Sequence, residues 1–219
     1  MPRIALIHAL AHSPPPINAA MAQLWPEAER MNLLDDSLSA DLARAGTLDA
    51  AMTARFFALS DYAVATGADA ILFTCSAFGP CIDAVKRRHA ARPVLKPNEA
   101  MIDEAVAFAG AQAAPGPIGL VATFAPTLAS MPAEFPPGVP VQVALAEGAL
   151  AALERGDGAA HDAAIVRAAQ ALAGQGCRLI ALAQFSMARA QGAVRTATGL
   201  PVLTTPESAV RRLRALLAA

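Results

Sequence analysis

The sequence predicts an α/β protein of two pseudo-symmetric lobes, each built from a mainly parallel sheet flanked by helices. Two observations lead to this prediction: short apolar runs alternate with longer helical patterns, and the chain carries an internal repeat. Alternation of strands and helices is typical of parallel α/β units. A chain of 219 residues buries enough of its surface on folding to form a core without disulfides or metal ions.

The strands predicted in the first half are four short apolar runs. They are "RIALIHAL" from residue 3, "RMNLLD" from residue 30, "AILFTC" from residue 70 and "PVLKP" from residue 93. The first run also resembles a short signal segment, but His8 interrupts it and only one arginine precedes it, so a strand is favoured. After the second run, Asp35 and Asp36 are expected in helix-capping or turn roles. A helix is predicted next from apolar residues spaced by three or four positions: Leu48, Met52, Phe56, Leu59 and Ala63.

The second half contains four further runs of the same kind. They are "PIGLVAT" from residue 117, "VPVQVAL" from residue 139, "RLIALA" from residue 178 and "PVLTT" from residue 201. The proline-rich segment "MPAEFPPGVP" is predicted to be a surface connection. A final helix is predicted to begin with Thr205 as its cap and Pro206 in its first turn.

The internal repeat relates the two halves. The segments "GADAILFTCSAFGP" and "PVLKPNEAMI" resemble "GCRLIALAQFSMAR" and "PVLTTPESAV", at offsets of 109 residues from Gly67 and 108 residues from Pro93. A repeat of this length predicts two copies of one α/β lobe with a cleft between them. Ligands of parallel sheets bind beyond the carboxyl ends of the strands, so Cys75 and its counterpart near Gln184 are expected to face this cleft.

Charge and cysteine content restrict the partners. A net charge of −1 gives no electrostatic reason to expect nucleic acid or an anionic membrane. No apolar run approaches the roughly 20 residues of a membrane span. The three cysteines show no pairing pattern, which favours a reducing, cytoplasmic location. The four histidines are scattered, so no metal site is expected.

Cys75 is the main candidate for chemistry. It lies in "ILFTCSAFGPC", where a strand gives way to small residues and a Gly-Pro pair. From position alone, it is either a catalytic thiol at a pocket mouth or a buried small side chain. A helix beginning just after it is expected to lower the pKa of its thiol. Packing roles are expected for Cys81 and Cys177.

The strand-end cysteine, the two-lobe repeat and the segment "GLVATFAPT" together resemble the aspartate/glutamate racemase superfamily, with its hydantoin racemases, maleate isomerase and arylmalonate decarboxylase. "TCSAFG" is the most telling match, because family members place a catalytic cysteine there. The resemblance implies lobes of residues 1–96 plus 206–219 and of residues 97–205, an active site in the interlobe cleft and no cofactor. Family members are often dimers, so the resemblance also suggests a homodimer.

One departure from the family pattern affects the expected reaction. Family members normally carry a second cysteine at the matching strand end of the other half, where this chain reads "ALAQFSMA". Cys177 cannot replace it, because it lies seven residues before Gln184, roughly 23 Å away on an extended strand. One-sided chemistry by a single thiol therefore becomes more plausible than symmetric racemisation.

The resemblance implies a cofactor-independent racemase or isomerase that acts at the carbon α to the carboxylate of a small acid, an amino acid or a derivative. Cys75 is the expected catalytic thiol, as acid/base or as nucleophile. The alternatives are a single-thiol decarboxylase or lyase of the arylmalonate type, and a catalytically degenerate carboxylate-binding protein. The residues expected to bind the substrate are His8, Ser13, Ser76, Ala77, Thr123, Gln184 and Ser186.

Overall fold

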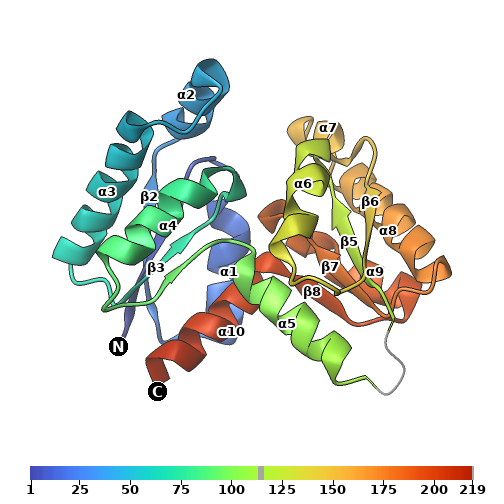
Figure 1. Cartoon of the computed structure of the whole chain (residues 1–219). Helices are drawn as coiled ribbons and strands as arrows, with labels where there is room; N and C mark the ends of the chain where they lie inside the picture. Colours follow the sequence, from blue (N-terminus) through green and yellow to red (C-terminus); the bar gives the residue numbers. More distant parts are fainter. Residues whose placement is uncertain (113–115, 219) are drawn as a thin grey trace. The chain divides into compact units, whose positions relative to one another are not determined.

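The computed structural model describes residues 1–112 and 116–218, which form two units (Figure 1). The first unit comprises Met1–Ala100 and Ala209–Ala219, and the second comprises Met101–Ser208. The chain passes between them within α5 (Glu99–Gly110) and within α10 (Thr205–Ala218). None of the described helices is both long and apolar enough to span a bilayer.

The first unit contains a four-stranded parallel sheet in the order β2-β1-β3-β4. Its strands are β1 (Arg3–His8), β2 (Glu29–Leu34), β3 (Ala70–Phe73) and β4 (Val94–Leu95). Three of them fall within predicted runs, and β2 begins at Glu29, one residue before its run. The register pairs Ile7 with Phe73 and His8 with Leu34, so the carboxyl ends of β1, β2 and β3 lie at one edge of the sheet.

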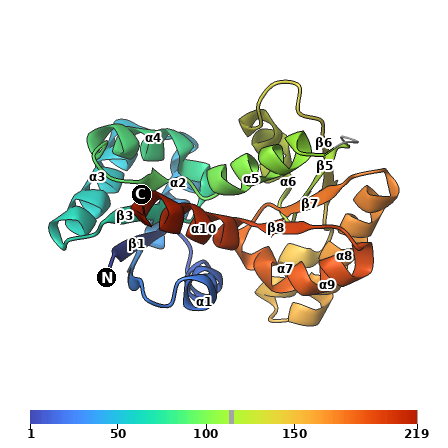
Figure 2. The ribbon, with the colours of Figure 1, turned by 90° about the horizontal axis from the view of Figure 1, so that it is seen from below.

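Helices cover both faces of this first sheet. Figure 2 shows α1 on one face and α3 with α4 on the other. The strands β1 and β3 are almost entirely buried, as expected for a parallel sheet covered on both sides. The helices that lie wholly in this unit are α1 (Pro14–Leu24), α2 (Ser37–Ala45), α3 (Ala50–Ala65), the 3-10 helix η1 (Ser76–Phe78) and α4 (Gly79–Arg88).

The core between the first sheet and α3 contains three phenylalanine rings. The ring of Phe56 stacks on Phe73 with centroids 5.3 Å apart and meets Phe78 at 5.0 Å. Aromatic pairs at such distances add attraction to the burial of apolar area. Phe56 comes from α3, Phe73 ends β3 and Phe78 ends η1, so the cluster joins three segments around the end of β3.

The second unit contains a parallel sheet in the equivalent order, β6-β5-β7-β8. Its strands are β5 (Ile118–Ala122), β6 (Val141–Leu145), β7 (Leu179–Leu182) and β8 (Val202–Thr204). Its other helices are α6 (Ala125–Ser130), η2 (Met131–Glu134), α7 (Ala149–Glu154), α8 (Gly158–Gly174), η3 (Phe185–Ala190) and α9 (Gln191–Thr198).

The two sheets confirm the predicted α/β fold of two related lobes. Ile7 pairs with Phe73 in the first sheet as Val121 pairs with Leu182 in the second. Counting onward from these pairs makes Cys75 equivalent to Gln184, the equivalence that the repeat predicts. α10 begins at Thr205, but the Thr205 hydroxyl is buried without a hydrogen-bond partner, so the predicted side-chain cap is wrong.

The Gly119→Ala variant tests the close packing of β5. A Cβ at Gly119 would lie 2.9 Å from Cδ1 of Ile180 and 3.1 Å from Cδ1 of Leu172 on α8. We expect a loss of about 1–3 kcal/mol in the free energy of unfolding, because the added methyl group overpacks this core. Urea unfolding followed by circular dichroism measures it.

Gly174→Ala is the matched control, because a Cβ there meets no atom within 4 Å. Gly174 ends α8, so alanine is expected to be neutral or to stabilise by up to about 1 kcal/mol. Equal stability of the Gly119→Ala variant and the wild type would contradict the packing of β5 against α8.

Candidate active site

Cys75 lies at the carboxyl edge of the first sheet. β3 ends at Phe73, and Cys75 keeps an extended backbone (φ −127°, ψ 121°) before η1 begins at Ser76. The apolar run "AILF" favours a strand, and the Gly79-Pro80 pair that follows starts α4. Of the three cysteines in the chain, only Cys75 is partly exposed, whereas Cys81 and Cys177 are buried, as predicted for packing residues.

The side chain of Cys75 contacts a small apolar pocket of about 10 Å³. This volume holds at most one water molecule. The pocket is therefore an apolar floor beside the thiol and has no room for a whole substrate. The lining residues are Ile7, His8, Ala9, Leu38, Phe56, Phe73, Cys75 and Phe78.

Burial raises the pKa of the Cys75 thiol. A hydrogen bond from the backbone N–H of Ala77 to Sγ acts in the opposite direction and does not offset the burial. The prediction of a lowered pKa is therefore wrong. The physical reason is that apolar side chains such as Phe56 and Phe78 remove water from the sulfur, while the segment after it is only a three-residue 3-10 helix. The resting thiol is protonated at neutral pH.

His8, at the end of β1, is fully buried and has both ring nitrogens in hydrogen bonds. Nδ1 lies 2.9 Å from Oγ1 of Thr74, and Nε2 lies 3.0 Å from Oδ1 of Asn32. Burial lowers the pKa of His8, and the bond to Asn32 opposes this only in part. The imidazole is therefore neutral. Its bond to Thr74 holds the residue that directly precedes Cys75.

The amide orientations along this network determine the tautomer of His8. Asn18 donates from Nδ2 to the carbonyl of Pro14 (2.8 Å), which leaves its Oδ1 to accept from Nδ2 of Asn32 (3.2 Å). Asn32 therefore turns its Oδ1 toward His8, and only a protonated Nε2 can donate to this oxygen. Nδ1 is then unprotonated and accepts from the Thr74 hydroxyl, whose oxygen lies 2.9 Å from Nδ1 and 3.4 Å from the carbonyl oxygen of Ile7.

The other residues predicted in the first unit differ in their exposure. Ser76 and Ala77 are exposed beside Cys75 at the edge of the sheet. Ser13 is buried next to the start of α1, where its N–H donates to the carbonyl of Leu10 (3.1 Å), and it lies outside the pocket lining. His8 lines the pocket, but its two nitrogens are engaged within the protein.

In the second unit, Thr123 and Gln184 are joined directly. Oε1 of Gln184 accepts two hydrogen bonds from Thr123, one from the backbone N–H (2.6 Å) and one from the hydroxyl (2.8 Å). Thr123 follows β5 and is buried, and Gln184 is partly exposed between β7 and η3. Ser186, also partly exposed, lies within η3. Within residues 1–112 and 116–218, no group of three His, Cys, Asp or Glu side chains is arranged to hold a metal ion.

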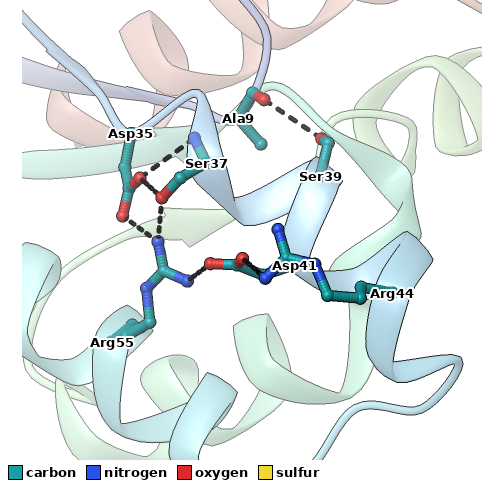
Figure 3. A network of polar contacts seen from close by, with 7 residues as sticks. All are labelled: Ala9, Asp35, Ser37, Ser39, Asp41, Arg44 and Arg55. Carbon is teal, nitrogen blue, oxygen red and sulfur yellow. Dashed lines mark hydrogen bonds and ion pairs between the residues drawn. The ribbon is translucent and has the colours of Figure 1, made fainter.

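A network of hydrogen bonds and ion pairs connects α2 to α3 (Figure 3), and none of its residues was among the predicted site residues. Arg55 on α3 donates from Nη2 to Oδ2 of Asp35 (2.6 Å) and from Nη1 to Oδ2 of Asp41 (2.5 Å). Oδ1 of Asp35 accepts from the N–H (3.2 Å) and the hydroxyl (2.6 Å) of Ser37, the first residue of α2. Asp35 thus fulfils the predicted turn role, whereas Asp36 makes no side-chain cap.

This network determines the position of one wall of the pocket. α2 carries Leu38, a fully buried residue that lines the pocket beside Cys75. Burial alone acts to raise the pKa of Asp35, but the bonds from Ser37 and Arg55 outweigh it and lower the pKa. Asp35 therefore stays ionised and paired well below neutral pH. Sequence analysis missed Arg55, since its partners lie 14 and 20 residues away and no local pattern indicates them.

The pH dependence of alkylation tests the state of Cys75. Because burial raises its pKa, iodoacetamide is expected to react more slowly at pH 7 than with an unstructured peptide thiol. The half-maximal rate is expected at a higher pH than for the peptide, measured by mass spectrometry. A Cys75→Ser control should remain unlabelled, because Cys81 and Cys177 are buried. A half-maximal rate at a lower pH would contradict the protonated resting thiol.

The Arg55→Met variant tests the attachment of α2. The variant loses the ion pairs of Arg55 with Asp35 and Asp41, which are partly exposed and together contribute about 1 kcal/mol. The hydrogen-exchange protection of the α2 amides is therefore expected to fall about fivefold. Mass spectrometry of the peptide that spans Ser37–Ala45 measures this change. The control is Arg44→Met, whose exposed side chain contacts only Asp41 of this network. Equal protection in both variants would contradict a specific role for Arg55.

The sequence and the structure were compared with those of known proteins. The sequence model of the Asp/Glu/hydantoin racemase family matches residues 16–213. A search of curated proteins gives no match. Similar solved structures include an aspartate racemase homologue from Pyrococcus horikoshii OT3, with a TM-score of 0.75 and 16% identity over 100% of both chains. They also include the allantoin racemase from Klebsiella pneumoniae, with a TM-score of 0.71 and 18% identity over 100% of this chain and 88% of that one.

Unliganded arylmalonate decarboxylase is similar as well, with a TM-score of 0.65 and 15% identity over 99% of this chain and 93% of that one. Identities this low show a shared fold and no more. The family model, in contrast, spans most of the 219 residues. The chain therefore belongs to the Asp/Glu/hydantoin racemase family.

Proposed function

We propose that the protein is a cofactor-independent enzyme that makes or breaks a C–H bond at the carbon next to the carboxylate of a small acid, with Cys75 as the group that carries the proton. The observation that carries this proposal is the position of Cys75. It is the only partly exposed cysteine, at the carboxyl end of a parallel strand and beside an apolar pocket. Family membership supports racemase-like chemistry.

The protonation state of Cys75 favours proton donation as the first act of the thiol. A raised pKa keeps Sγ protonated at neutral pH, and a neutral thiol can act as a general acid. In a decarboxylation, the C–C bond to the departing CO₂ breaks and its electron pair remains as an enediolate. The S–H bond of Cys75 then breaks, its proton forms the new C–H bond, and the thiolate regains a proton from water.

The surroundings of Cys75 supply positioning and charge stabilisation. Thr74, held by His8, orients the strand end before the thiol. The exposed hydroxyl of Ser76 can donate to a substrate carboxylate, on which negative charge develops in the transition state. The apolar floor that includes Leu38 and Phe56 suits a substrate with an apolar α-substituent.

Gln184 favours one-sided proton transfer over two-base racemisation. Racemisation by two thiols needs a second titratable group on the opposite face of the α-carbon. An amide side chain neither gives nor accepts a proton near neutral pH, and Gln184 is the equivalent of Cys75 in the second unit. A single-thiol lyase is therefore the second candidate function. Both candidate functions use Cys75. A racemase breaks the C–H bond at the α-carbon, whereas the lyase breaks the C–C bond to the departing CO₂.

Incubation in D₂O tests the proposal. Enantiopure 2-substituted carboxylic acids and 2-substituted malonic acids are the substrates, followed by NMR for α-deuterium and by CO₂ release. Cys75→Ala is expected to lower turnover by about 10²–10⁴-fold, the usual contribution of a general acid. Cys177→Ala, which changes a buried thiol of the second unit, is the control.

The products distinguish the two candidates. Deuterium incorporation with loss of enantiomeric purity indicates racemisation, whereas CO₂ release with a single-enantiomer product indicates one-sided protonation. Full turnover by the Cys75→Ala variant would overturn the role of Cys75.

A further inference from the structure

The strand β6 forms one edge of the second sheet, and its outer side is accessible. The strand order places β5 beside it on one side and no strand on the other. All five residues of β6 are at least partly exposed, whereas all five residues of β5 are buried. An edge strand carries a row of unpaired N–H and C=O groups on which another strand can pair.

The register with β5 determines which backbone groups of β6 point outward. The N–H of Ile118 donates to the carbonyl of Pro140 (2.9 Å), and the N–H of Ala146 donates to the carbonyl of Ala122 (2.8 Å). Backbone groups of a strand point alternately to its two sides, so the even-numbered residues of β6 bond to β5. The outward N–H and carbonyl groups belong to Val141, Val143 and Leu145. Within residues 1–112 and 116–218, no hydrogen bond from outside the sheet reaches them.

The side chains beside this edge are apolar. Val143 is 46% exposed and Leu145 is 37% exposed, and both point to the same face of the sheet because side chains alternate along a strand. Leu145 pairs with Ala122 of β5, and Phe124, which is 49% exposed, follows two residues later. An exposed apolar patch of this kind is typical of an interaction surface.

β6 lacks the features that usually keep an edge strand from pairing. Natural edge strands are protected by charged side chains, prolines or bulges. Residues Val141–Leu145 include no charge and no proline, and their register with β5 is unbroken. In contrast, β2, the corresponding edge strand of the first sheet, begins with the exposed residues Glu29 and Arg30. The two equivalent edges of the repeat therefore differ, and only the β2 edge carries charges.

We propose that β6 is a homodimer interface, on which a second copy of the chain pairs its own β6 in the antiparallel direction about a two-fold axis at Val143. In this register, Val143 faces Val143 of the second copy, and Val141 faces Leu145. Both are hydrogen-bonded pairs, so each outward N–H donates to an outward carbonyl and none of these groups is left over. The same surface then serves both copies, as two-fold symmetry requires.

Charge favours a second copy as the occupant of this edge. When β6 meets itself, the facing residues are Val141 with Leu145, Gln142 with Ala144, and Val143 with itself, so no like charges meet. The first charged residue beyond the strand, Glu147, lies opposite Val139 and far from its own copy. A basic or acidic partner strand would instead place its charges against uncharged, apolar side chains.

Sedimentation velocity of the full chain between about 1 and 300 µM tests the interface, since a strand pair is smaller than a standard interface and a micromolar Kd is expected. The wild type is expected to show a monomer–dimer equilibrium. Val143→Lys is expected to raise the Kd at least about tenfold, because two lysines would face each other across the axis. Leu34→Lys is the matched control, because Leu34 is a 47% exposed residue of the β2 edge and its replacement should leave the Kd unchanged.

Cross-linking tests the register in a Cys75→Ser background, which removes the only partly exposed cysteine. Val143→Cys is expected to form a disulfide between two chains under mild oxidation, because Cα atoms of a facing pair lie about 5.5 Å apart. Val141→Cys is not expected to cross-link to its own copy, since the two positions lie roughly 14 Å apart along the strands. A mixture of the Val141→Cys and Leu145→Cys chains should cross-link. Non-reducing electrophoresis measures all three.

A wild type that remains monomeric at every concentration would overturn the proposal, whatever other strand the edge accepts. A dimer that Val143→Lys leaves intact, or a disulfide formed by Val141→Cys alone, would overturn it as well. Circular dichroism checks that Val143→Lys, a change of an exposed side chain, is folded. None of these measurements depends on turnover, so the outcome is independent of the proposed reaction.

Discussion

One backbone hydrogen bond at the end of the central strand pair positions the candidate residues in each unit. The N–H of Thr74 donates to the carbonyl of Ile7 (3.1 Å), and the N–H of Ala183 donates to the carbonyl of Val121 (2.9 Å). Parallel pairing brings the carboxyl ends of neighbouring strands to the same edge. The residue after each donor, Cys75 or Gln184, therefore lies beside the residues that follow the neighbouring strand.

The repeat keeps this backbone and changes the chemistry at its end. In the first unit, the position holds a thiol that an apolar pocket keeps protonated. In the second unit, it holds an amide that accepts two hydrogen bonds from Thr123. One side chain has a proton to transfer, and the other has an oxygen that occupies a pair of donors. The two halves therefore present different chemical groups at equivalent positions, a thiol in the first unit and an amide in the second.

The thiol depends on supports from separate segments of the first unit. His8 holds Thr74 through a network that extends to Asn32 and Asn18, and Arg55 fastens the helix that carries Leu38. Neither His8 nor Arg55 appears among the causes of the shift in the Cys75 pKa, which are burial and the hydrogen bond from Ala77. The surroundings of Cys75 are mostly apolar although its side chain stays partly exposed, and burial outweighs the hydrogen bond from Ala77 in its effect on the thiol pKa.

By itself, the sequence determined the eight strands, their relation by a repeat and the position of Cys75 at a strand end, because strand periodicity and internal repeats can be read from the order of residues alone. That a second cysteine is missing followed from the resemblance to the family. Only the tertiary structure decided the direction of the Cys75 pKa, the bonds of His8 and the role of Arg55. It also decided the bonds from Thr123 to Gln184, which are 61 residues apart. The physical reason is that desolvation and side-chain hydrogen bonds depend on groups distant in the chain, which no local pattern relates.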